Sequence, residues 1–309
     1  MNDFEIFALP LAKLIAPTAE QHVGDWRLLR RLCLPPRLNR PGAGIIKRGL
    51  IVDVETTGLS LDSDEVIQLA MLPFDYEVES GLIIDIHHHN AFEEMREPAV
   101  GISEEASLIT GIKDADVAGK AIDPNIVEEM VSGADLVIAH NAQFDRPMVE
   151  KLWPAFKTKP WACSLTGVDW LREGFAAGKL DYLGMQFGWF YDGHRALADC
   201  EACLALLAQQ LPKSNTQVLA VVREAALNEE YLVRAIDTPY DARMLLKARG
   251  YRWRPAELPN GKVWWISTSD AATEIDWLQS EVYGTVTSIP TSRITALNRY
   301  SERIWEDAN

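Results

Sequence analysis

The chain has 309 residues, which at roughly 150 residues per domain predicts about two domains. Hydrophobic residues make up 48% of it, enough to build a core in each domain, so a disordered or fibrous protein is excluded. The net charge of −15 argues against a protein that coats nucleic acid or an anionic membrane through its overall field.

The sequence is typical of a cytoplasmic protein. It contains no run of about 18 apolar residues, and acids stand near its start where a secretory signal would carry a basic flank. Its four cysteines are too few and too scattered for a disulfide framework in a chain of this length. We therefore expect a reducing compartment.

Residues 1–47 are expected to form an N-terminal helical appendage with a linker. A helix is predicted over Asp25–Leu34, and the Pro- and Gly-containing stretch PPRLNRPGAG follows it. Residues 1–50 carry 8 basic and 4 acidic side chains, whereas residues 51–230 carry 12 and 31. The acidic charge is therefore concentrated in the middle of the chain.

Residues 48–212 are predicted to form an α/β domain. Three apolar runs at 49–59, 65–77 and 81–92 have short connections, so they are expected to be antiparallel strands. Helices at 103–109 and 123–131, a buried strand at 134–140, a helix from about Pro147 and a helix at 198–211 follow. This order predicts a mixed sheet with helices on its faces.

Residues 213–285 are expected to form a small α+β module of unknown role. Its helix YDARMLLKARG should end at Gly250, and YRWR and KVWWIS should form a hairpin whose loop contains Asn260 and Gly261. A further helix is expected over DAATEIDWLQSEVYG. The tail, residues 286–309, is expected to add a short helix with Ile294, Leu297 and Ile304 on one side.

Asp53 and Glu55 are the first candidates for chemistry. They stand two residues apart in an apolar run, so their side chains point to the same face of a strand. Two converging carboxylates are costly unless cations neutralise them, and Mg²⁺ prefers oxygen ligands of this kind. The alternative is an ordinary solvent-facing edge strand.

Asp145 follows the strand LVIAH in the stretch HNAQFDRP. The ends of strands are where α/β folds place reacting groups, which makes this carboxylate a second candidate. Because it precedes Pro147, it could equally be a helix N-cap.

His194 and Asp199 stand in the stretch GHRALADCEACLALL. Five residues turn a regular helix through about 140° beyond one full turn, so His194 must precede the helix if both side chains are to reach one spot. A histidine there can accept a proton from water near neutral pH. The alternative is a surface histidine beside a helix.

Together, VDVETTGL, AHNAQFD and HRALAD resemble the three motifs of the DEDDh group of 3′→5′ exonucleases. That group includes the epsilon subunit of bacterial DNA polymerase III and RNase T, and has a ribonuclease H-like fold. The resemblance covers roughly residues 48–212 and includes EASLITGI and LDYLGMQFGW. The sister group has tyrosine where this chain has Arg195, so the histidine subclass matches better.

The resemblance implies a role for each site residue. Two divalent ions, Mg²⁺ or Mn²⁺, would be held by Asp53, Glu55, Asp145 and Asp199, with His194 as general base. The terminal nucleotide would be held by Thr56, Thr57, Gly58 and Leu59, with Leu59 as a wedge against its base. His140 and Asn141 would contact a phosphate or brace the site.

Three other motifs are assigned to ordinary structure. His87, His88 and His89 alternate faces on a strand, so they are expected to form a polar edge rather than a metal site. Cys200 and Cys203 lie on an apolar helix and are expected to pack in a core. The stretch QLAMLPF looks like a sliding-clamp peptide, but its place on a predicted core strand favours interior packing.

The C-terminal module combines aromatic and basic residues. Six basic residues and one acid lie between Arg243 and Lys262, and Trp253, Trp264 and Trp265 fall within the hairpin. We expect the tryptophans to form the core of the module and the arginines to solvate it or guide a substrate. The alternative is that the aromatic rings stack bases while the basic residues contact phosphates. The pattern LKARGYRW…KxWW faintly resembles small appendages of other bacterial exonuclease-like chains, which adds no mechanism.

These features predict a metal-dependent 3′→5′ exonuclease that releases nucleoside 5′-monophosphates from single-stranded ends, with DNA favoured over RNA. A polymerase or repair partner could bind through the C-terminal module. Two alternatives stay open. One is an exoribonuclease similar to RNase T, and the other is a non-catalytic nuclease-fold subunit of a polymerase assembly.

Overall fold

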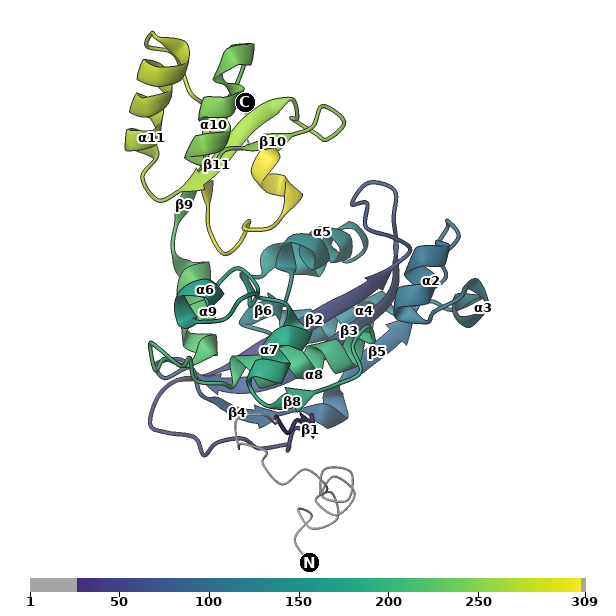
Figure 1. Cartoon of the computed structure of the whole chain (residues 1–309). Coiled ribbons are helices and arrows are strands. Elements are labelled where there is room, and N and C mark those ends of the chain that lie inside the picture. The colour runs from purple at the N-terminus through teal and green to yellow at the C-terminus, as the bar shows by residue number, and fades with distance from the viewer. Residues whose placement is uncertain (1–26, 307–309) are drawn as a thin grey trace, which may run out of the picture.

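A computed structural model describes residues 27–306. Its largest element is a six-stranded mixed sheet in the order β4-β3-β2-β6-β7, with β5 also paired to β3 (Figure 1). Its strands are β2 (Ile46–Thr56), β3 (Val66–Glu77), β4 (Ile83–Ile86), β5 (Phe92–Met95), β6 (Leu136–Ala139) and β7 (Trp161–Cys163). β2 and β3 pair antiparallel, whereas β2–β6 and β6–β7 pair in parallel. The predicted mixed sheet is confirmed.

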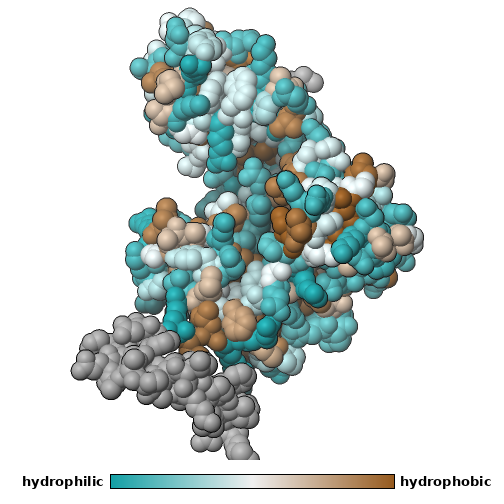
Figure 2. All heavy atoms as spheres, turned by 45° about the vertical axis from the view of Figure 1, so that its right-hand side comes forward, coloured by the Kyte–Doolittle hydropathy of each residue, from teal (hydrophilic) through white to brown (hydrophobic). Residues whose placement is uncertain are grey.

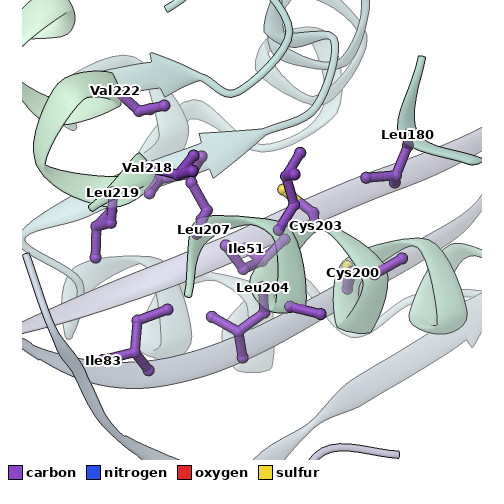
Figure 3. Close-up of a cluster of buried hydrophobic side chains, with 14 of the residues drawn as sticks. Ile51, Ile83, Leu180, Cys200, Cys203, Leu204, Leu207, Val218, Leu219 and Val222 are labelled. Carbon is purple, nitrogen blue, oxygen red and sulfur yellow. The ribbon is translucent and has the colours of Figure 1, made fainter. Parts of the chain in front are cut away.

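Helices cover both faces of this sheet because β2 alternates its side chains between two cores. Leu50, Val52 and Val54 pack into one core with residues of α4 (Pro124–Ser132) and α5 (Ala142–Leu152). Ile51 faces the opposite core, against α7 (Leu180–Gln186), α8 (Ala196–Leu207) and α9 (Val218–Leu227). Figure 3 shows Ile51 beside Leu204 of α8 in this second core.

Two short helices, α2 (Glu104–Thr110) and α3 (Asp114–Val117), follow β5, and α6 (Trp170–Glu173) follows β7. The predicted helix at 103–109 is confirmed as α2, where the Ser103 side chain accepts a hydrogen bond from the Ala106 N–H and caps its start. Between residues 27 and 306 no helix is both long and apolar enough to cross a bilayer.

The helix predicted over Asp25–Leu34 is wrong in its described part. Residues 27–34 are extended, and β1 (Arg30–Arg31) pairs in parallel with β8 (Trp189–Phe190). Arg31 donates to Asp192 at 2.8 Å and its guanidinium stacks over the Phe190 ring. These contacts with a distant part of the chain override the local helical pattern. Asp25 itself lies outside the described residues.

The second sheet has the order β10-β11-β9-β12 and contains β9 (Glu230–Ala235), β10 (Arg252–Arg254), β11 (Val263–Thr268) and β12 (Thr291–Ile294). Its helices are α10 (Arg243–Arg249) and α11 (Ala271–Trp277), and the latter continues as a π-helix to Tyr283. Gly250 ends α10 with a φ of 102°, as predicted, and β10 and β11 form the predicted hairpin. We call residues 230–294 the C-terminal module; Figures 1 and 2 show it as a separate lobe.

The tail does not form the predicted helix. Ile294 ends strand β12, Leu297 is half-exposed in a turn, and Ile304 lies in a short 3-10 helix, Glu302–Trp305. The carbonyls that a helix would need are already engaged, because the Ala296 carbonyl accepts the Trp161 N–H at 2.8 Å. Helix α9, which no sequence pattern predicted, lies in the range assigned to the small module but packs into the core of the large sheet through Val218 and other residues. The domain boundaries themselves stay predictions.

Arg146 of α5 joins the tail to the large sheet. Its guanidinium is fully buried and donates to the carbonyls of Leu297 at 2.6 Å, Arg299 at 2.7 Å and Ala296 at 3.2 Å. It also forms an ion pair with Glu150 at 2.7 Å, one helical turn further on. One buried cation therefore holds three tail carbonyls and one carboxylate.

Replacing Arg146 should destabilise the protein strongly. Arg146→Ala removes three hydrogen bonds to the tail and the nearest cation of the buried Glu150, which keeps Ser301 and Arg303 as partners, so we expect the free energy of unfolding to fall by about 3 kcal/mol. Urea denaturation measures this, with Lys151→Ala on the exposed side of the same helix as control. Equal stability of the two variants would contradict the role given to Arg146.

Candidate active site

Three carboxylates from two elements meet at one end of the large sheet. Asp53 and Glu55 alternate with the buried Val52 and Val54 on β2, so they face the side that α8 covers. Carboxylate oxygens of Asp53, Glu55 and Asp199 all lie within 4.8 Å of one another. The predicted convergence of these three side chains is therefore present in the structure.

Asp145 reaches the same region from α5. Its Oδ1 accepts the backbone N–H of Val54 at 3.3 Å, and only 4% of the residue is exposed. The expected helix start near Pro147 is wrong, because α5 begins at Ala142 with Asn141 as its N-cap, and Pro147 lies inside the helix. Asp145 is therefore a first-turn residue that faces β2, and the N-cap alternative is excluded.

Asp199 is oriented by two hydrogen bonds. The Tyr191 hydroxyl donates to its Oδ1 at 2.8 Å, and the Arg195 N–H donates to its Oδ2 at 3.0 Å. The sequence analysis did not single out Tyr191. The only signal was its place between a short strand and the helix that carries Asp199, and eight residues of separation made a contact unpredictable from spacing.

His194 lies in the loop before α8, which begins at Ala196, as the angular argument predicts. The residue is exposed and has a φ of 63°, a left-handed conformation that few side chains other than glycine adopt. It stands next to Arg195, whose backbone N–H donates to Oδ2 of Asp199 at 3.0 Å. Strained conformations of this kind are characteristic of functional loops.

Burial and mutual repulsion disfavour ionisation of these carboxylates. Burial, then the charges of Asp145, Asp199 and Glu55, raises the pKa of Asp53 well above its usual range. Burial and the Asp199 charge raise the pKa of Glu55 to about 7, and burial raises the pKa of Asp145 to about 8. Burial also raises the pKa of Asp199, against the hydrogen bonds from Tyr191 and Arg195.

This donor set fits a hard divalent cation. All four side chains offer carboxylate oxygens, the ligand type that Mg²⁺ and Mn²⁺ prefer. Their raised pKa values reflect the unfavourable free energy of ionising the cluster without cations, and a nearby positive charge would lower these pKa values again. No other group of three His, Cys, Asp or Glu side chains within residues 27–306 is close enough to hold a metal.

The loop after β2 is fixed by a bulge and by contacts with Asp64. A bulge shifts the β2–β3 register between Glu55 and Thr56, and the Thr57 hydroxyl donates to Asp64 Oδ1 at 2.8 Å. A Cβ at Gly58 would come within 2.6 Å of the Asp64 carboxylate, so glycine is required there. Leu59 is 85% exposed at the tip, where the wedge role would place it.

His140 and Asn141 occupy different settings. His140 Nδ1 lies 2.9 Å from the Ser164 hydroxyl, and burial lowers its pKa to about 4, so the ring is neutral at neutral pH. A neutral, tethered ring favours bracing over phosphate binding. Asn141 is exposed, and its carbonyl accepts the first N–H of α5 from Phe144 at 2.7 Å.

The other motifs are structural. Cys200 and Cys203 are buried on α8 in the core, as expected, and Gln68 is buried on β3. The histidine run is not a strand edge, because β4 ends at Ile86 and residues 88–90 form a 3-10 helix. His87 Nε2 instead lies 2.9 Å from Asp75 Oδ2.

An all-carboxylate cluster at one end of a mixed sheet, next to an exposed histidine, defines a candidate metal-dependent hydrolase. A family model described as "Exonuclease" matches residues 50–207, which is about half of the chain. The chain belongs to this exonuclease family. The predicted family is thereby confirmed, whereas the polarity, the substrate and the number of ions stay predictions.

Curated relatives agree with this assignment. DNA polymerase III PolC-type of Listeria innocua is 30% identical over 186 residues, which is 58% of this chain and 12% of that protein. The Bacillus subtilis PolC-type protein is 33% identical over 173 residues, 52% of this chain and 11% of that protein. The Aquifex aeolicus DNA polymerase III subunit epsilon is 27% identical over 157 residues, 48% of this chain and 73% of that protein. The chain spans about a tenth of the PolC-type relatives.

Solved structures give weaker likenesses. Exonuclease X in complex with 5′ overhanging duplex DNA matches 56% of this chain and 99% of its own, with 24% identity and a TM-score of 0.40. Exonuclease I from Methylocaldum szegediense matches 63% of this chain and 49% of its own, with 19% identity and a TM-score of 0.45.

Removing one carboxylate should stabilise the protein when no divalent ion is present. Glu55 and Asp145 take up protons on folding, so the free energy of unfolding should fall as pH rises from about 4 towards 8 in EDTA. Asp53→Asn removes the group on which all three neighbouring charges act. At pH 8 we expect Asp53→Asn to raise the free energy of unfolding by about 1 kcal/mol or more, which corresponds to a pKa shift of about one unit.

Urea denaturation in EDTA measures this gain, and Asp62→Asn, an exposed carboxylate in the following loop, is the matched control. If Asp53→Asn were no more stable than this control at pH 8, repulsion within the cluster would be excluded.

Proposed function

We propose that this chain is a metal-dependent 3′→5′ exonuclease that hydrolyses single-stranded DNA ends to nucleoside 5′-monophosphates. The observation that carries the proposal is the meeting of Asp53, Glu55 and Asp199 within 4.8 Å in a chain of the exonuclease family. The relatives named DNA polymerase III support DNA over RNA as the polymer.

Each residue has a role in this proposal. Asp53, Glu55, Asp145 and Asp199 hold two divalent ions, and Tyr191 keeps the Asp199 carboxylate oriented. Bound ions of this kind stabilise both the attacking and the leaving oxygen of an in-line displacement at phosphorus. His194 accepts the proton of the attacking water, whose oxygen forms the new bond to phosphorus while the bond to the 3′ oxygen of the preceding nucleotide breaks. That oxygen takes up a proton from solvent to give the new 3′ hydroxyl, and the 5′-monophosphate is released.

The loop residues account for the preference for an end. Thr56 and Thr57 are buried next to the carboxylates and fix the loop through Gly58 and Asp64, and the exposed Leu59 at its tip stacks against the terminal base. His140 braces the strand end through Ser164, and Asn141 lies at the start of the helix that carries Asp145. A base that must be held by such a wedge is most accessible in a single strand.

The direct test uses a 5′-labelled single-stranded oligonucleotide in DNA and RNA versions, with Mg²⁺ or Mn²⁺. We expect a ladder of 3′-shortened products that disappears in EDTA and with Asp53→Ala, while Asp62→Ala keeps it. A faster ladder on RNA would support the exoribonuclease alternative. No ladder on either polymer from folded protein would favour the non-catalytic alternative.

Replacing His194 should slow hydrolysis as the loss of a general base does. His194→Ala should lower kcat by about 10²- to 10⁴-fold and make the fall in rate on the acidic side of the pH profile less steep, since the carboxylates are then the remaining groups that must lose a proton. Single-turnover rates between pH 5.5 and 8.5 measure this. An unchanged pH profile with a small loss of rate would contradict the role.

A further inference from the structure

The C-terminal module has eight basic and eight acidic residues, but its basic residues are concentrated in one stretch. Six basic residues lie between Arg243 and Lys262 with one acid, Glu257. Arg249 forms an ion pair with Glu274 at 3.0 Å, and Arg254 forms one with Glu302 at 2.5 Å.

The other four basic residues of this stretch are exposed, and no carboxylate within residues 27–306 forms an ion pair with them. They are Arg243, Lys247, Arg252 and Lys262. In a chain of net charge −15, four unneutralised cations in one short stretch are free to meet an anionic partner.

Two exposed aromatic rings belong to the same segment as these cations, whereas Arg252 alternates with Trp253 on β10 and stacks over the Trp265 ring at 5.0 Å on the other face of the strand. Trp253 is 47% exposed on the edge strand β10, although its ring packs edge-on against Trp264 at 5.4 Å. Tyr240 is 73% exposed, and the Arg243 guanidinium lies 4.3 Å from the centre of its ring. The expected core role of the tryptophans holds for Trp264, but Trp253 leaves a large face open to solvent.

The same hairpin borders the proposed active site. Leu258 and Pro259, in the loop between β10 and β11, line a cavity of about 260 Å³ together with Leu61 and Asp62. Leu61 lies two residues after Leu59, in the loop that would hold the terminal nucleotide. The hairpin loop of the C-terminal module and the loop that would hold the terminal nucleotide therefore line one cavity.

We propose that Trp253 and Tyr240, with Arg243, Lys247 and Lys262, form a second binding surface for single-stranded nucleic acid. This proposal rests on the proposed function, because the surface would hold the strand on the 5′ side of the terminal nucleotide. Phosphates pair with the cations, and bases stack on the open aromatic faces. An acidic protein segment would satisfy the cations alone, whereas the open rings beside them match the alternation of phosphate and base.

The test separates binding from cleavage. Fluorescence anisotropy in EDTA measures binding of oligothymidylates of four and twenty nucleotides, and 3′ shortening in Mg²⁺ is measured on the same two lengths. We expect the longer oligomer to bind the wild type more tightly. Trp253→Ala should weaken that binding by about fivefold or more, the lower end for one base stack.

Lys247→Gln with Lys262→Gln provides a second variant that leaves the core of the module untouched. It should weaken binding of the long oligomer and reduce the slope of log affinity against log salt by about 1.4, which is 0.7 for each lost phosphate contact. Arg172→Gln with Lys213→Gln removes two exposed cations from the large domain and is the matched control. Rates on the four-nucleotide substrate should stay unchanged in all variants.

Equal binding of the two lengths by the wild type, or wild-type binding by both module variants, would overturn the proposal. Loss of a bound acidic protein from the variants with unchanged DNA binding would overturn it in favour of that partner. Length-dependent binding that the variants lose, without 3′ shortening by the wild type, would instead reject the proposed function and keep this surface.

Discussion

The candidate metal site is governed by the electrostatic cost of burying four carboxylates close together. Asp53 and Glu55 lie on one face of β2 because strand side chains alternate, α8 brings Asp199 over the same face, and Asp145 approaches Val54 from α5. Burial raises the pKa values of all four, and like charge adds to this for Asp53, Glu55 and Asp145, so the fully ionised cluster is unfavourable unless cations balance it. A protein gains nothing in stability from such a cluster, which is why it points to chemistry.

Helix α5 connects this site to the C-terminal tail. Asp145 and Arg146 are neighbours on α5, about 100° apart around its axis, so one faces β2 and the other faces the tail. Arg146 is satisfied only by carbonyls between residues 296 and 299 and by Glu150. The position of a site carboxylate and the docking of the C-terminal tail are therefore set by adjacent residues of one helical turn.

The sequence was informative where the structure is local. Alternation in β2 and β3, the capped α2, the stop of α10 at Gly250 and the place of His194 before α8 all follow from spacing and residue type. The errors lie where distant segments meet. Arg30 and Arg31 pair with β8 instead of forming a helix. The tail carbonyls accept hydrogen bonds from Arg146, and the Tyr191 hydroxyl orients Asp199 from the preceding loop. Such contacts leave no periodic signal in the segments that make them.

The central claim is that the four carboxylates hold two divalent ions in position for phosphodiester hydrolysis. Calorimetric titration of the apo protein with Mn²⁺ in the presence of a nucleoside 5′-monophosphate measures the number of ions directly. The account predicts two ions per chain for the wild type, and weakened binding with fewer ions for Asp53→Asn and for Asp145→Asn. No binding, or identical binding by the wild type and both variants, would contradict it.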